Sequence, residues 1–313
     1  MSTYNRIDVH QHIVPPFWAE ALPLHGGDPS GWKSPEWSPA SAIRFMDDLQ
    51  IGCGILSLTA PGLSGWQGAA RSEMARRIND YAAEIVHGNP QRFGNFVTLP
   101  LPDIDAALRE LDYALNDLHA DGVVLMTNYD GIYLGDARFE PLWQALDSRA
   151  CVVFIHPFKP PMTPLDGMPA PLTDFPADTT RTALHMTING VMRRYTRMKV
   201  ILSHAGGFLP YACERYAELL PGLNAELSAE VIRDDLRRFY FDTALSCGSI
   251  SLTALLAFAR PGHVLYGSDY PYAPASVGAS FTAQLDAFDG FQGELRAQVN
   301  RDSALILFPR LMK

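Results

Sequence analysis

The sequence predicts a single (β/α)8 (TIM) barrel over residues 1–313, with its active site at the C-terminal ends of the strands. Three observations lead to this prediction. The length of 313 residues suits a barrel, which needs about 250 residues plus insertions. Short apolar runs alternate along the chain with segments of helical periodicity. No internal repeat or low-complexity linker divides the sequence.

Each predicted strand is a short apolar run bounded by turn residues. The eight runs are residues 7–12, 53–58, 93–99, 122–126, 151–156, 200–204, 239–243 and 264–268. Because helical segments separate them, the strands are expected to be parallel, and eight such units close into a barrel.

The predicted helices carry apolar residues three and four positions apart. They are residues 39–49, 74–87, 104–119, 141–149, 182–194, 210–220 and 251–259. Ser38, Asp103 and Ser251 are predicted helix caps. Residues 14–37 and 157–176 are rich in Pro and Gly, and each follows a strand. We expect these two insertions to be long loops over the mouth of the barrel.

Composition narrows the class of protein. Hydrophobic residues make up 47% of the chain and charged residues 19%, as in a globular protein with a large core. The net charge of −9 and the lack of a basic run argue against nucleic acid or anionic membranes as partners. Neither an apolar stretch of membrane-spanning length nor a signal-peptide pattern occurs, so we expect a cytoplasmic protein. The scattered cysteines indicate free thiols.

Residues 7–13 contain the most informative motif, a pair of histidines at His10 and His12. On a strand, side chains alternate between faces, so Asp8, His10 and His12 would point the same way. Two imidazoles at this spacing can bind one cation. By itself the motif leaves open a pair of surface histidines on an edge strand.

Further polar residues lie at the C-terminal ends of predicted strands. His156 and His204 each end a strand, and Asp269 directly follows one. Asp242, near another strand end, is expected to line the site without ligating. Barrel enzymes keep their active sites at this end of the strands. Histidine and carboxylate ligands suit zinc, manganese or iron, so the set predicts a metal site.

The order of these motifs resembles a known family. The series is Asp8-x-His10-x-His12, His156-Pro157, His204-Ala-Gly-Gly207 and Gly267-Ser-Asp269-Tyr-Pro271. It resembles the amidohydrolase-related (amidohydrolase 2) decarboxylases typified by aminocarboxymuconate semialdehyde decarboxylase, from residue 6 to about residue 308. Within that family, residues 26–32, 56–62 and 178–183 look most like the 6-methylsalicylate decarboxylases.

The resemblance implies roles for individual residues. It implies one divalent metal, zinc with manganese as the alternative, held by His10, His12, His156 and Asp269. It also implies that His204 is an unligated histidine that activates a metal-bound water or positions the substrate.

The resemblance also bears on substrate binding and assembly. Arg215 matches an arginine that reaches into a neighbouring subunit and binds the substrate carboxylate, which implies a homodimer or higher oligomer. From the residues alone, Arg215 could equally be an exposed helix arginine. The semialdehyde decarboxylases carry a second such arginine in a longer first loop. Residues 14–37 contain none, which favours a small aromatic monocarboxylate over a dicarboxylate.

The chemistry of decarboxylation fits this set of residues. Loss of CO₂ from an aryl acid leaves a carbanion unless the ring carbon is protonated first, and an ortho hydroxyl lets the substrate chelate one metal. Asp269 is the first candidate for the acid and His204 the second. Phe158 and Tyr270 closely follow ligand-bearing strand ends and are predicted to contact the substrate ring. Asp8 is expected to orient a ligand imidazole.

The predicted function is therefore a metal-dependent, non-oxidative decarboxylase of a salicylate-type or related unsaturated acid. A mononuclear hydrolase of an amide, lactone or ester, or a hydratase, could use the same metal, with a water deprotonated by Asp269 or His204. Residues 122–126 contain no lysine that could bridge two metals, which weakens a binuclear hydrolase. A non-catalytic metal-binding barrel is the third reading.

Overall fold

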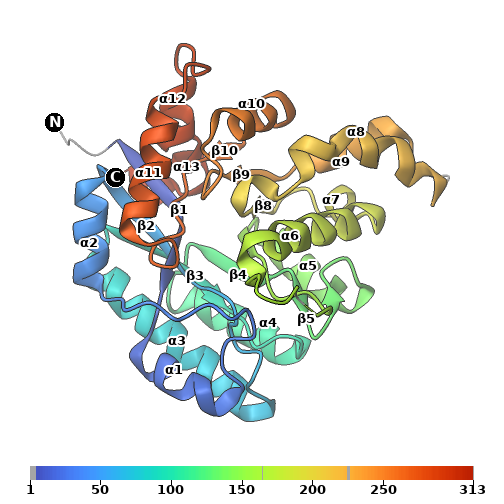
Figure 1. Ribbon diagram of the computed structural model, residues 1–313. Helices are drawn as coiled ribbons and strands as arrows, with labels where there is room; N and C mark the ends of the chain where they lie inside the picture. Colours follow the sequence, from blue (N-terminus) through green and yellow to red (C-terminus); the bar gives the residue numbers. More distant parts are fainter. Residues whose placement is uncertain (1–4, 164, 224–225, 313) are drawn as a thin grey trace.

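A sheet of eight parallel strands curls into a nearly closed barrel in the computed structural model, which describes residues 5–163, 165–223 and 226–312 (Figure 1). The strand order is β1-β2-β3-β4-β7-β8-β9-β10. The first and last strands meet along a seam. There, the Val9 N–H donates to the Tyr266 carbonyl at 3.0 Å and the His12 N–H to the Tyr270 carbonyl at 2.8 Å.

Each of the eight predicted runs overlaps a barrel strand. The strands are β1 (Arg6–Ile13), β2 (Ile51–Leu58), β3 (Phe93–Thr98), β4 (Gly122–Met126), β7 (Val152–His156), β8 (Lys199–Leu202), β9 (Tyr240–Asp242) and β10 (Val264–Leu265). The last is shorter than predicted because the Tyr266 N–H turns away to the carbonyl of Val299. A hairpin of β5 (Asn128–Tyr129) and β6 (Ile132–Tyr133), which was not predicted, follows β4.

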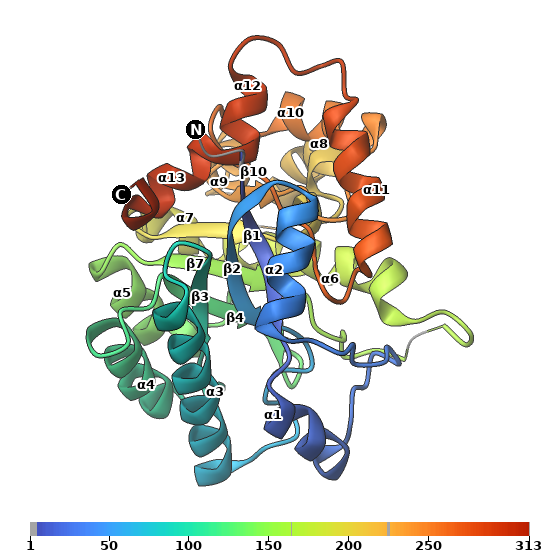
Figure 2. The same cartoon turned by 90° about the vertical axis from the view of Figure 1, so that its left-hand side faces the viewer.

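Helices cover the outside of the barrel (Figure 2). The longer ones are α2 (Pro39–Asp48), α3 (Gly68–Gly88), α4 (Ile104–Asn116), α5 (Glu140–Ser148), α6 (Ala170–Ile188), α8 (Leu209–Leu219), α9 (Ala229–Leu236), α10 (Ser249–Phe258) and α11 (Ala275–Asp286). The shorter ones are α1 (Pro16–Ala21), α7 (Val191–Arg194), α12 (Leu295–Ala297) and α13 (Ser303–Leu307). Within the described residues, none is long and apolar enough to cross a membrane.

Two of the three predicted caps are present. Ser38 accepts the Ser41 N–H in a capping box, and Asp103 accepts the Ala106 N–H. Ser251 is not a cap, because α10 already begins at Ser249.

The two predicted insertions are more ordered than expected. The first contains α1 and a 3₁₀ turn at Leu22–His25. The second ends where α6 begins, at Ala170, well before the predicted helix start. Pro176 lies inside α6 and interrupts the pattern from which the sequence prediction was made. The unpredicted helix α11 has small and polar residues on much of its surface, so its helical periodicity is weak.

Phe154 on β7 fills the barrel interior beneath the strand ends. Its ring stacks on Phe96 with centroids 5.5 Å apart and meets the His10 ring edge-on at 4.9 Å. The side chain is fully buried. Because close-packed interiors respond to the loss of even one side chain, Phe154 supports the position of His10 from below.

We expect Phe154→Ala to lower the free energy of unfolding by about 3–5 kcal/mol, because it leaves a cavity in the barrel interior. Chemical denaturation followed by circular dichroism measures this loss. The control is Ile306→Ala on α13, where the side chain is 73% exposed and the expected change is within about 0.5 kcal/mol. Equal effects of the two substitutions would contradict this packing role.

Candidate active site

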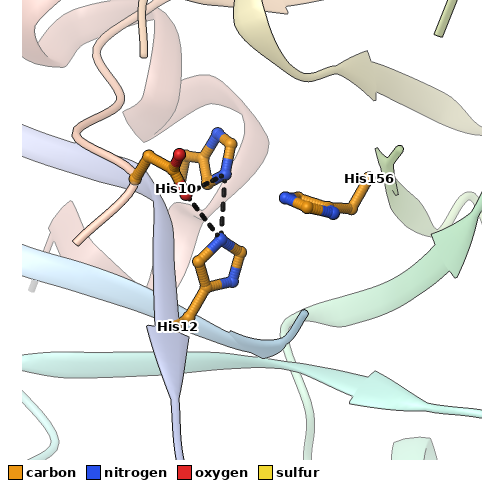
Figure 3. A group of neighbouring side chains, drawn as sticks. His10, His12 and His156 are labelled. Atoms are coloured by element: carbon orange, nitrogen blue, oxygen red, sulfur yellow. Dashed lines mark hydrogen bonds and ion pairs between the residues drawn. The ribbon is translucent and has the colours of Figure 1, made fainter. Parts of the chain in front are cut away.

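Three histidines and one aspartate meet at the C-terminal end of the barrel. His10 and His12 come from β1, His156 ends β7 and Asp269 follows β10, and Figure 3 shows the three imidazoles converging. One ligand atom from each residue lies within 4.8 Å of all the others, and all four residues are buried. The fold therefore brings together the four predicted ligand residues as a group that can hold one metal ion.

The rings on β1 are fixed by hydrogen bonds on their far side. His10 Nδ1 lies 2.7 Å from Asp242 Oδ2, and His12 Nδ1 lies 3.0 Å from Ser57 Oγ. Since carboxylate and hydroxyl oxygens accept the Nδ1–H, Nε2 is the nitrogen of each ring that can bind a cation once it is deprotonated. The two Nε2 atoms face each other at 3.0 Å. Such an approach is stabilised by a cation between them, which is the arrangement of a metal site.

His156 completes the donor set from the opposite wall. Its Nδ1 lies 2.9 Å from the Pro157 carbonyl, which accepts the Nδ1–H and again leaves Nε2 as the donor atom. The Thr127 N–H donates to the His156 carbonyl at 3.0 Å. Thr127 Oγ1 in turn donates to the buried carboxylate of Asp178, which also accepts from Asn128 at 2.9 Å. The ends of β4 and β7 are thereby joined behind the site.

The electrostatics of the group favour a bound cation. Burial disfavours a charged His10, but the carboxylates of Asp242 and Asp269 outweigh it and raise the pKa of His10 to about 10. Burial lowers the pKa of His12 and holds that of His156 well below its usual value. These two imidazoles are thus kept neutral, as metal ligands must be. Three imidazoles and one carboxylate are donors that zinc and manganese both accept.

Asp242, which was expected only to line the site, has a larger structural role. It is fully buried at the end of β9 and bonds the His10 ring through Oδ2. Its Oδ1 accepts the backbone N–H groups of His204 and Ala244, each at 2.9 Å. Asp242 was found in the sequence in the same way as His156 and His204, from its position at the end of a predicted strand. The sequence did not show that its partner would be the His10 ring, because the two residues are far apart in the chain.

Asp8 does not orient an imidazole as predicted. Its Oδ1 accepts the backbone N–H of His10 at 3.1 Å and of Ser268 at 3.0 Å, and its Oδ2 accepts the Gln11 amide at 2.9 Å. Burial raises the pKa of Asp8 to about 6. The Asp8 carboxylate therefore holds the main chain of both ligand-bearing segments together at the seam. Its hydrogen bonds go to backbone N–H groups and to the Gln11 side chain, and none goes to an imidazole ring.

His204 lies beside the four residues without belonging to their group. Its Nε2 is 3.4 Å from Asp269 Oδ2, whereas Asp269 Oδ1 faces His12 Nε2 at 3.0 Å. His204 and Asp269 have φ values of 52° and 63°, in the left-handed region that residues with a side chain adopt uncommonly. Gly207 of the same motif is required for close packing, because a Cβ there would lie 2.1 Å from the Pro176 carbonyl.

A cavity of about 600 Å³ opens above the group. His156, His204 and Asp269 line its inner end. Its walls are mainly apolar, with Trp32, Phe175, Phe208, Leu245 and Phe281 among the lining residues. Within the part of the chain that the structure describes, no lysine or arginine lines it. The volume and the apolar walls suit a small aromatic ring.

The two predicted substrate contacts do not line this cavity. Tyr270 is buried and stacks on Phe45 at a centroid distance of 4.1 Å, because the chain turns it away from the side that Asp269 faces. Phe158 faces a separate small pocket, and its N–H bonds Thr127 at 2.9 Å. Several aromatic residues that sequence reasoning missed line the cavity, among them Tyr272, whose ring meets the His12 ring edge-on at 5.7 Å.

Arg215 does not reach the cavity of its own chain. It lies exposed on α8, a helix that projects from the barrel together with α9 (Figure 1). Tyr211, one turn earlier on the same helix, lines the cavity mouth and is 88% exposed.

The barrel and its buried histidine and aspartate group define a metal-dependent barrel enzyme. The family model described as amidohydrolase matches residues 7–310. The chain belongs to this amidohydrolase family, as the resemblance of its motifs predicted.

Known proteins similar to this chain are decarboxylases and amidohydrolases. The 6-methylsalicylic acid decarboxylase of Penicillium expansum is 43% identical, over 98% of this chain and 97% of that protein. The crystal structure of an amidohydrolase II superposes with a TM-score of 0.91 at 32% identity, covering 97% of this chain and 99% of the other. A dihydroxybenzoic acid decarboxylase from Polaromonas sp. JS666, with bound manganese and 2-nitroresorcinol, has a TM-score of 0.76 at 23% identity, covering 99% and 98%.

We expect Asp242→Asn to weaken metal binding about 10–100-fold, because it removes the charge that orients His10 and strengthens its Nε2 as a donor. Competition with a chromogenic chelator measures the affinity. Asp234→Asn is the matched control, since this exposed carboxylate pairs with Arg260 away from the site. An unchanged affinity in Asp242→Asn, with circular dichroism like that of the wild type, would contradict the assignment.

Proposed function

We propose that this protein is a metal-dependent, non-oxidative decarboxylase that acts on a small aromatic acid of the salicylate type. The observation that carries the proposal is the position of the group of His10, His12, His156 and Asp269 at the inner end of an apolar cavity of ring size. The similarity to 6-methylsalicylic acid decarboxylase, which extends over nearly the whole of both chains, supports the substrate class.

The four residues of the group are the proposed ligands of one divalent ion. Such an ion would supply a Lewis acid that holds the carboxylate and the ortho oxygen of the substrate. Zinc is the metal we expect, and the manganese in the dihydroxybenzoic acid decarboxylase makes manganese the alternative.

Asp269 and His204 are the proposed catalytic pair. Asp269 Oδ1 faces the ligand imidazoles, so Oδ2, which lies 3.4 Å from His204 Nε2, is the oxygen that we propose carries the proton. The proton goes to the ring carbon that bears the carboxylate. The bond from this carbon to the carboxylate then breaks, its electron pair stays with the ring, and the products are the phenol and CO₂.

The cavity walls have a part in this reaction as well. Apolar side chains around the ring exclude water, which strengthens the electrostatic contacts at the inner end of the cavity. Trp32, Phe175 and Tyr272 provide aromatic faces and edges among the lining residues. They take the place of Phe158 and Tyr270 as proposed substrate contacts.

A binuclear hydrolase is disfavoured by the strand that would carry the ligand shared by its two metals. β4 (Gly122–Met126) holds no lysine, so it cannot supply a bridging carboxylated lysine. The family description, amidohydrolase, therefore identifies the fold of this chain and does not by itself define its reaction.

Incubation with 2-hydroxybenzoates is expected to release CO₂ and to remove the ultraviolet band of the acid. Asp269→Asn and His156→Ala are each expected to abolish turnover, because the first removes the proton carrier and both remove a ligand. Metal content is measured on the same preparations. Substantial CO₂ release by His156→Ala with no bound metal would contradict the mechanism, and hydrolysis of lactones or amides without CO₂ release would favour the hydrolase.

A homodimer is the proposed assembly, with Arg215 acting at the partner's cavity. Exposed apolar side chains gather at the mouth, including Tyr211 on α8 and Ile250 on α10. Large exposed apolar patches mark protein interfaces. Because the described residues lining the cavity include no cationic side chain, an arginine from a second subunit would supply one.

Mixed dimers of an Arg215→Ala subunit and a His204→Ala subunit are expected to recover activity. One of their two sites would combine an intact His204 with an intact arginine from the partner. Dimers that pair His204→Ala with Arg109→Ala, an exposed arginine on α4, provide the reference for one intact His204 site. No recovery in the first mixture alongside recovery in the second would rule out a shared site.

A further inference from the structure

The cavity contains one charged side chain that the proposed reaction does not use. Asp28 lines its wall, on the loop between α1 and α2. It belongs to the stretch Gly-Gly-Asp-Pro-Ser-Gly-Trp at residues 26–32. Asp269, the other carboxylate that lines the cavity, is bonded by His12 and His204. Asp28 has no histidine partner of this kind among the described residues.

The loop that carries Asp28 is fixed firmly in place. The His25 ring stacks on Trp66 at 4.2 Å, and its Nδ1 lies 3.3 Å from the Gly65 carbonyl. A Cβ on Gly65 would lie 1.6 Å from the His25 carbonyl oxygen, so only glycine allows this approach. Gly26, with φ of 93°, then turns the chain in a way that residues with a side chain rarely adopt. Asp28 is therefore held at the cavity wall by the backbone.

The carboxylate of Asp28 has little to compensate its charge. Its Oδ1 accepts the Ser30 N–H at 2.8 Å. No ion pair to a lysine or arginine of the described chain is formed. Burial raises the pKa of Asp28, the direction expected for a poorly solvated carboxylate without a cationic partner.

Tyr272 connects Asp28 to the inner end of the cavity. Its ring lies against that of His12, and burial together with the charges of Asp28 and Asp269 raises the pKa of its hydroxyl. The two carboxylates therefore act on the same small space. Asp28 and the residues of the inner end line one cavity, so a substrate held at the inner end shares that cavity with the Asp28 carboxylate.

We propose that Asp28 is a specificity-determining residue, which makes this site reject substrates that carry a second carboxylate on the ring and accept those with a neutral group there. This inference rests on the proposed function for the orientation of the substrate. In a cavity with apolar walls, like charges repel more strongly than in water. A built-in repulsive group discriminates against the wrong ligand without contributing to binding of the right one.

The test compares two ligands that differ in one ring substituent, which is neutral in the first and negatively charged in the second. They are 6-methylsalicylate and 3-hydroxyphthalate, in which a carboxylate replaces the methyl group. Asp28→Asn keeps the shape of the side chain and its hydrogen bond from Ser30 but removes the charge. The ratio of kcat/KM values, and the ratio of dissociation constants from isothermal titration calorimetry with the metal-loaded protein, are measured for both ligands.

We expect Asp28→Asn to shift both ratios at least about tenfold toward the dicarboxylate, with the monocarboxylate changed much less. Asp28→Ser tests the same loss of charge if the asparagine variant folds poorly. Asp166→Asn, an exposed carboxylate in the loop before α6 that does not line the cavity, is the matched control and should leave the ratios unchanged.

The outcomes separate this inference from the proposed function. If the wild type releases CO₂ from 6-methylsalicylate but both Asp28 variants keep the wild-type ratios within twofold, the role of Asp28 is overturned. If the wild type releases no CO₂ from any hydroxybenzoate, the proposed function fails, while the ratio of dissociation constants still shows whether Asp28 rejects a second carboxylate.

Discussion

The site is organised by two buried carboxylates whose charge His10, the one imidazole of the group with a raised pKa, neutralises only in part. Asp242 and Asp269 are both buried next to three imidazoles, two of which burial keeps neutral. Removing carboxylates from water is costly unless they are paired. A divalent cation between the Nε2 atoms would satisfy both carboxylates at once, one directly and one through His10. The orientation of each ring, the strained backbone at Asp269 and the hydrogen bonds of Asp8 all serve this arrangement.

The same constraint links catalysis to selectivity. Because a cation held by the group would balance the charge at the inner end of the cavity, the rest of the cavity can remain apolar and hold an aromatic ring. Any further charge in it then has a large effect, and Asp28 is the one that the chain supplies. In this proposal the positions of the charged groups on the ring decide which substrates bind. The reacting carboxylate would lie at the cation, and a neutral substituent would lie toward Asp28.

The sequence was sufficient for the barrel, because strand periodicity is a local signal. For the four residues of the metal group, the polar strand ends were sufficient only together with the resemblance to a known family. It was insufficient where the direction of a side chain depends on distant partners. Tyr270 faces the core because Phe45 stacks on it. Asp242 bonds His10 across the barrel. The predicted start of α6 was too late because Pro176 lies inside this helix, where proline is usually excluded. The close contact between Pro176 and Gly207 joins this part of α6 to the site loop, and the sequence gives no sign of that contact.

The seam between β1 and β10 has a consequence for how the protein becomes active. The site takes His10 and His12 from the first strand and Asp269 from the segment after the last one, and Asp8 bonds the main chain on both sides. The two ends of the chain must therefore dock before any complete site exists. A chain released early from the ribosome, or one whose last strand has come loose, has no aspartate beside its histidine pair. A complete site can therefore form only when the whole barrel has closed.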